Sequence, residues 1–66
     1  MNVVVKYVAP ARYVALCGGR NGEGATPDDA ALRCARKALL PDDVPHIRDS
    51  KQYGKETWLF TVEGNF

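Results

Sequence analysis

The 66-residue sequence holds few of the residue types from which metal sites and nucleophilic active sites are built. It has one histidine, His46, and two cysteines, Cys17 and Cys34. His46 has no cysteine or second histidine at metal-ligand spacing beside it and no recognisable nucleophile to activate. Two cysteines do not make a disulfide framework, so we expect two reduced core thiols, with a Cys17 to Cys34 bridge as the alternative. We therefore expect a protein that is not an enzyme and needs no cofactor and no metal.

Long apolar runs and an excess of one charge are also missing. No run reaches the roughly 20 residues that a membrane-spanning helix needs. The apolar first sixteen residues are interrupted by Lys6 and Arg12 and lack a clean cleavage pattern, so we expect a cytoplasmic chain that is complete from its Met1. A net charge of +1 predicts neither a disordered chain nor strong attraction to polyanions. At this length we expect a single domain, residues 1–66, whose stability a partner or dimerisation would supplement.

The stretch from Thr26 to Leu40 is the one segment long and periodic enough to predict a helix. Thr26 is a favourable N-cap and Pro27 suits the first helical position. Acidic residues precede basic ones along the segment, as the helix dipole favours. The apolar face consists mostly of small side chains, so we expect the sheet to supply the bulk of the core. Pro41 is expected to end the helix.

Alternating apolar residues predict strands at 2–9, 12–17 and 56–63, and a shorter strand at 46–49. The short link around Pro10 predicts a hairpin between the first two. Trp58 and Phe60 are expected to fill the space that the small helix face leaves. These elements predict an α+β fold of order β-β-α-β-β, with one helix packed on one face of a small, four-stranded, mainly antiparallel sheet.

A glycine-rich connection, residues 18–25 with the sequence GGRNGEGA, leads into the helix. A strand, glycines and a helix N-terminus are the layout of phosphate-binding loops. Ala25 stands where the Walker A motif has its lysine, however, so the cation that reaches the terminal phosphates is missing. We expect a surface loop with an Asn21-Gly22 turn, or an extension of the second strand that folds back on itself. Whether this loop is ordered or binds an anion stays open at this point.

A single helix can cover only one face of such a sheet. The other face is expected to show aliphatic and aromatic groups rimmed by charge, which is typical of a protein interface or a homodimer face. Scattered surface hydrophobics are an equally ordinary explanation. The candidate interface residues on this face are Val4, Val8, Tyr13 and Leu59.

An acidic loop that carries Asp42 and Asp43 between two prolines is a second candidate contact. An acidic surface can occupy a nucleic-acid groove on a partner protein. A basic patch of Arg33, Arg36 and Lys37 on the helix suggests a different class of partner, a nucleic acid. The near balance of charges and the lack of a known RNA- or DNA-binding signature make that the alternative.

The sequence therefore predicts a small non-catalytic protein-interaction module. We expect it to bind another protein, or a second copy of itself in a homodimer, and we expect no membrane partner. In size and element order, though in no motif, the chain resembles the compact standalone proteins that bacteriophages and other mobile elements encode. This resemblance implies an inhibitor that docks on a host enzyme or defence complex. The alternative is a small nucleic-acid-binding protein that uses the basic helix face.

Overall fold

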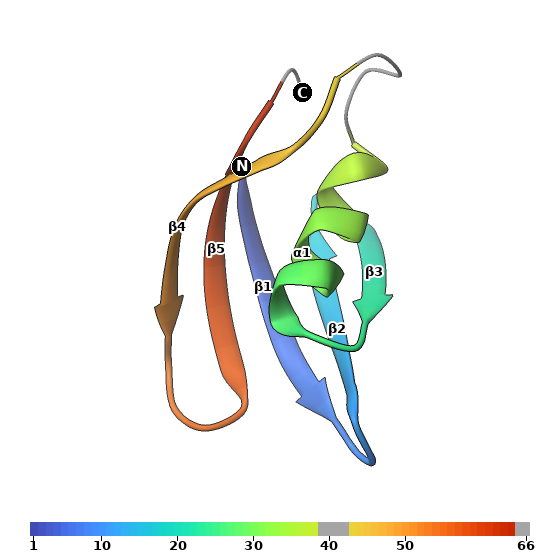
Figure 1. The fold of residues 1–66 in the computed structure, drawn as a ribbon, viewed down its shortest axis with the longest axis vertical. Helices are drawn as coiled ribbons and strands as arrows, with labels where there is room; N and C mark the ends of the chain where they lie inside the picture. The colour runs from blue at the N-terminus through green and yellow to red at the C-terminus, as the bar shows by residue number, and fades with distance from the viewer. Residues whose placement is uncertain (39–42, 65–66) are drawn as a thin grey trace.

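A computed structural model describes residues 1–38 and 43–64 and confirms the α+β class. Five antiparallel strands form one sheet, and one helix packs on one face of it (Figure 1). The strands lie in the order β3-β2-β1-β5-β4, so β1 is central and β3 and β4 are the edges. The elements are β1 Asn2–Val8, β2 Arg12–Cys17, β3 Arg20–Gly24, α1 Pro27–Arg36, β4 His46–Gln52 and β5 Thr57–Glu63.

The fifth strand, β3, corrects the expected strand number of four. Gly18 and Gly19 have φ angles of 51° and 78°, and positive φ at both positions is what a type I′ hairpin turn requires. The turn therefore lies at Gly18-Gly19, and Asn21 and Gly22 are part of β3. The alternative in which the second strand folds back on itself is the one that holds.

Helix α1 lies mainly over β3 and β2 and least over β4 (Figure 1). Thr26 caps it as expected, since its hydroxyl oxygen accepts a hydrogen bond from the Asp29 amide at 3.1 Å. The helix ends at Arg36, earlier than predicted, because the next two amides bond three residues back, as in a tight 3₁₀-type turn. Leu39, Leu40 and Pro41 lie outside the described residues.

Small residues on both sides bring the helix close to the sheet. The buried helix face consists of Ala30, Ala31, Cys34 and Ala35, and the sheet opposes it with residues that include Ala15 and Cys17. Phe60 is buried as predicted, whereas Trp58 is half-buried and packs against the core from its edge. Val3, Val5 and Val62 of the sheet are also buried.

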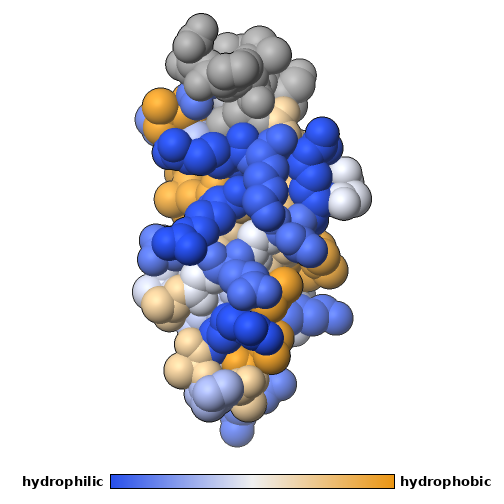
Figure 2. All heavy atoms as spheres, turned by 90° about the vertical axis from the view of Figure 1, so that its right-hand side faces the viewer, coloured by the Kyte–Doolittle hydropathy of each residue, from blue (hydrophilic) through white to orange (hydrophobic). Residues whose placement is uncertain are grey.

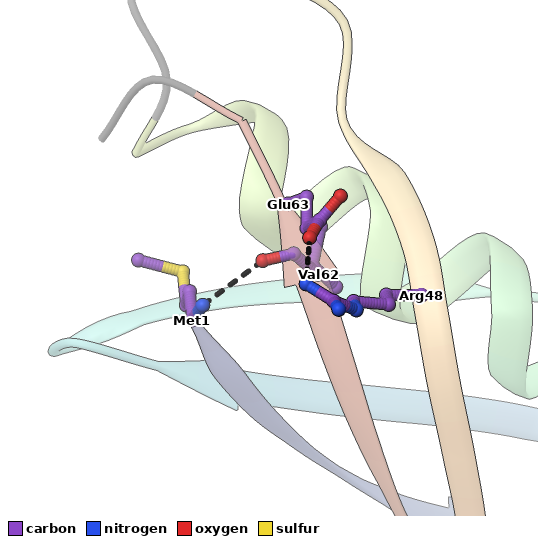
Figure 3. Close-up of polar contacts among 4 residues, drawn as sticks. All are labelled: Met1, Arg48, Val62 and Glu63. Carbon is purple, nitrogen blue, oxygen red and sulfur yellow. Dashed lines mark hydrogen bonds and ion pairs between the residues drawn. The ribbon is translucent and has the colours of Figure 1, made fainter.

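Two polar contacts tie β5 to its neighbours, one from the start of the chain beside β1 and one from β4 (Figure 3). The Met1 amino group donates to the Val62 carbonyl at 2.9 Å, which extends the pairing of β1 with β5 by one residue. A register shift between Ile47 and Asp49 leaves Arg48 without a partner residue in the ladder, and its guanidinium pairs with the Glu63 carboxylate. Among the described residues, no helix is long and apolar enough to cross a membrane.

Candidate interaction surfaces

The sheet face opposite α1, here called the open face, carries a continuous apolar row. The strand register places Val4 of β1 directly between Leu16 of β2 and Leu59 of β5. Val4 and Leu16 are 37% and 54% exposed, and Leu59 is half-buried. Directly opposed side chains on neighbouring strands lie close enough to touch, so the three form one apolar strip across the middle of the sheet.

Polar groups flank this strip at both ends and beside its centre. Asn21 pairs with Leu16 at one end of the row, and Lys51 pairs with Leu59 at the other. Lys6 lies two residues along β1 from Val4 and is exposed. An apolar centre with a polar rim is the usual composition of a protein interface.

The register also settles which predicted residues share the open face. Val4, Val8 and Leu59 lie there, whereas the expected position of Tyr13 is wrong. Tyr13 pairs with Tyr7 on the helix side of the sheet and packs against the core. Its ring lies 5.4 Å from those of Tyr7 and Trp58, edge to face in both cases. Leu16 and Val14 take its place on the open face.

The sequence pattern did contain a signal for Leu16. Ala15 and Cys17 are small enough to sit beneath a closely packed helix, and they are buried. Since successive side chains of a strand point to opposite faces, burying Ala15 and Cys17 turns Val14 and Leu16 outward. The prediction put the large Tyr13 on the open face, although alternation along the strand places Tyr13 on the same side as the small Ala15 and Cys17.

The structure describes only one of the two acids in the predicted acidic loop. Asp42 lies outside the described residues, and Asp43 is half-buried. The Asp43 carboxylate accepts a hydrogen bond from the Val44 amide at 2.9 Å. At least part of its capacity as an acceptor is therefore used within the chain.

The three predicted basic residues, Arg33, Arg36 and Lys37, do lie together. With Asn21, Gly22 and Glu23 they line a hollow of about 530 Å³ between α1 and the edge strand β3. The Lys37 ammonium donates to the Asn21 carbonyl at 2.6 Å. No ion pair joins Arg33 or Arg36 to an acid within the part of the chain that the structure describes.

The two cysteines lie in the core as free thiols. The Cys34 thiol is wholly buried and donates to the Arg20 carbonyl at 3.5 Å. Burial, with a hydrogen bond to Cys17, raises the pKa of Cys34 to about 12. Because the thiolate is the reactive form, such a thiol is a packing group at neutral pH.

His46 lies on the edge strand β4, exposed and opposite Glu63. Across residues 1–38 and 43–64, no three histidine, cysteine or acidic side chains are grouped so that they could hold a metal ion. The candidate sites of the described chain are thus surfaces: the apolar open face and the basic hollow beside β3. Comparison of the chain with protein-family models, curated proteins and solved structures finds no match.

Proposed function

We propose that the protein is a non-catalytic interaction module of the cytoplasm that binds another protein through the open face of its sheet. The observation that carries this proposal is the apolar row of Leu16, Val4 and Leu59. Moving each of these side chains out of water would lower the free energy by about 25 cal/mol per Å² of apolar surface buried. The open face of the sheet offers that surface to a partner without a change in its own backbone.

The chemistry of the described polar groups supports a binding role over catalysis. Arg12 pairs with Glu23 at 3.6 Å, and Arg48 pairs with Glu63, so these charges are matched on the surface. The buried Cys34 is held as a neutral thiol by its raised pKa. An active site would instead gather such groups around one reacting atom.

The proposal takes a more specific form from the resemblance in size and element order to proteins of bacteriophages and other mobile elements. In that form the protein is an inhibitor, and its open face docks on a host enzyme or defence complex. A small rigid domain can block a large partner when a few buried apolar anchors dominate the contact. Leu16 is the best candidate anchor, because it is the most exposed of the row.

Nucleic-acid binding through Arg33, Arg36 and Lys37 is the second candidate function. Its support is that all three cations line one hollow. The Lys37 ammonium is engaged by a backbone carbonyl, however, and the net charge of the chain is only +1. Binding of this kind would weaken steeply with added salt, whereas an apolar interface would not.

Affinity capture of the tagged protein from a bacterial lysate, with and without nuclease, tests the proposal. Leu16→Lys places a charge at one end of the row, on its most exposed side chain, and Tyr53→Lys is the matched control. Tyr53 is 57% exposed against 54% for Leu16, and it lies in the turn between β4 and β5, outside the three-residue row and two residues past Lys51.

We expect one protein complex in stoichiometric amount, unaffected by nuclease, lost with Leu16→Lys and kept with Tyr53→Lys. Nuclease-sensitive recovery of many nucleic-acid-binding proteins would favour the basic patch instead. An empty capture, together with sedimentation that shows a dimer sensitive to Leu16→Lys, would make a second copy the partner. Capture that survives Leu16→Lys would contradict the role of the open face.

A further inference from the structure

We propose that the free edge of β3 and the basic side of α1 form a second binding site, which takes an extended acidic segment of a partner protein as an added sheet strand. The site is distinct from the open face. It combines two features that meet in one hollow: an unpaired strand edge, and two arginines with no acidic partner among the described residues.

The β2–β3 hairpin fixes which backbone groups of β3 reach the free edge. Its two-residue turn makes Cys17 and Arg20 a hydrogen-bonded pair, and such pairs alternate along an antiparallel ladder. Asn21 and Glu23 fall at the non-bonded positions, so their amide and carbonyl groups point away from β2. The direction is borne out at Asn21, whose carbonyl accepts from Lys37 of the helix.

The helix supplies one wall of the hollow along this edge. Arg33, Arg36 and Lys37 are exposed and line it, and the backbone of Asn21, Gly22 and Glu23 lines the other side. Figure 2 shows this side of the molecule, where hydrophilic side chains gather over β3 and α1. A strand added to β3 would therefore run beside a row of cations.

The charges select the chemistry of the occupant. Glu23 is the one acid among the lining residues, and it lies 3.6 Å from Arg12, so it is already matched. The two arginines have no acidic partner in the described chain and are suited to carboxylates. Since alternate residues of a strand face the same side, the segment should carry aspartate or glutamate at every second position.

In the unbound protein, the Lys37 side chain caps a backbone acceptor on this edge. Its ammonium satisfies the Asn21 carbonyl, which an incoming strand would replace with a backbone amide. The freed ammonium would then be available to a carboxylate of the segment. An added strand would pair with the backbone amide and carbonyl of Glu23, whereas a nucleic acid bound to the cations would not.

The other sheet edge is protected in a different way. Strand β4 has a register irregularity at Arg48 and carries charges that include Asp49 and Lys51. Bulges and edge charges are the devices by which proteins prevent strand addition. Strand β3 pairs with β2 in an unbroken register, and the Lys37 side chain caps the Asn21 carbonyl on its edge. Strand addition is therefore expected at β3.

The test uses the full chain and a fluorescein-labelled seven-residue peptide in which glutamate alternates with threonine. We expect saturable binding by fluorescence anisotropy, and in ¹H–¹⁵N spectra the largest shifts at the amides of Asn21 and Glu23. Arg33→Gln combined with Arg36→Gln should weaken binding about tenfold or more, because charge-assisted hydrogen bonds are lost. Lys51→Gln, a charge change on the opposite edge, should leave the affinity unchanged.

Altered peptides keep the test independent of the folding of any variant. The same peptide with glutamine for glutamate should bind at least tenfold more weakly, and versions N-methylated at alternate residues should lose binding in one of the two registers. Absence of binding at millimolar peptide, equal affinity of both N-methylated versions, or no effect of the arginine substitutions would overturn the proposal. So would tighter binding of a single-stranded oligonucleotide at the same residues, or a concentration-dependent β3 to β3 dimer without peptide.

Discussion

At the scale of single residues, Gly22 sets how closely α1 can approach the sheet. A Cβ atom there would lie 2.5 Å from the Cys34 amide nitrogen and 2.9 Å from the Ala30 carbonyl oxygen. Both are backbone atoms of a helix, so neither can move aside alone. The glycines that resembled a phosphate-binding loop therefore have structural roles in the hairpin turn and in the contact with the helix.

Gly22→Ala should accordingly lower the free energy of unfolding by about 2 kcal/mol, the typical cost of overpacking. Alanine also restricts the unfolded chain, but that gain is below about 1 kcal/mol and does not offset the clash. Asn21→Ala, at the exposed neighbouring position, should change stability by less than about 0.5 kcal/mol. Urea denaturation of both variants measures the difference, and equal midpoints would show that α1 does not pack this closely on β3.

Cys34 should make stability depend on alkaline pH. Burial raises the pKa of its thiol from 9.0 to about 12, so between these values the folded chain holds a proton that the unfolded chain releases. The free energy of unfolding is expected to be unaffected by this group below about pH 8 and to fall as pH rises from 9 to 12. Tyrosines and lysines titrate there too, and comparison with Cys34→Ala separates their contribution.

Denaturation at a series of pH values should thus show a steeper fall for the wild-type chain than for Cys34→Ala. In the same samples at pH 8, a thiol reagent should label Cys34 only after unfolding. Parallel slopes for the two proteins, or rapid labelling of the folded chain, would place Cys34 outside the core.

At the scale of secondary-structure elements, β3 is the element that the sequence pattern indicated only as an alternative to a surface loop. Its residues RNGEG lack the β-branched and aromatic side chains that favour strands, and two of the five are glycine. The strand exists because the turn at Gly18-Gly19 directs it back along β2 and because α1 can lie close over glycine. Both causes depend on tertiary neighbours, whereas the helix cap at Thr26 is encoded locally and was predicted.

The turn at Gly18-Gly19 gives a direct test of how β3 forms. Gly18→Val should destabilise the protein by about 1–2 kcal/mol, because a β-branched residue is strained at a φ of 51°. Gly18→Asn should have little effect, since asparagine before glycine is favoured in type I′ turns. Thermal unfolding of the two variants measures both effects, and equal losses would argue against a turn of this type.

At the scale of the whole molecule, the sequence was sufficient for the fold class, the start of the helix and four of the five strands. Hydrophobic periodicity carries that information because each element buries one face. Which residues of a strand face the helix is harder to infer, and Tyr13 was placed on the wrong face for this reason. Consequently the open face was predicted with Val4, Val8 and Leu59 but without Leu16, its most exposed member.

The two proposed surfaces meet along β3. Asn21 and Glu23 present their backbone groups to the edge, while the side chain of Glu23 pairs with Arg12 of β2. A partner could therefore cover the open face and continue as a strand on β3. Of the two acids in the predicted acidic loop, the structure describes Asp43, which lies before β4.

Site-specific photo-crosslinking in a nuclease-treated bacterial lysate tests the central claim most directly. A benzoylphenylalanine replaces Leu16 in one sample, Tyr53 in a second and Arg36 in a third. We expect one prominent protein adduct from position 16 and none from position 53, with position 36 reaching the same partner if the β3 site is used. No adduct from position 16, or adducts with nucleic acid from position 36 alone in untreated lysate, would contradict binding of a protein through the open face.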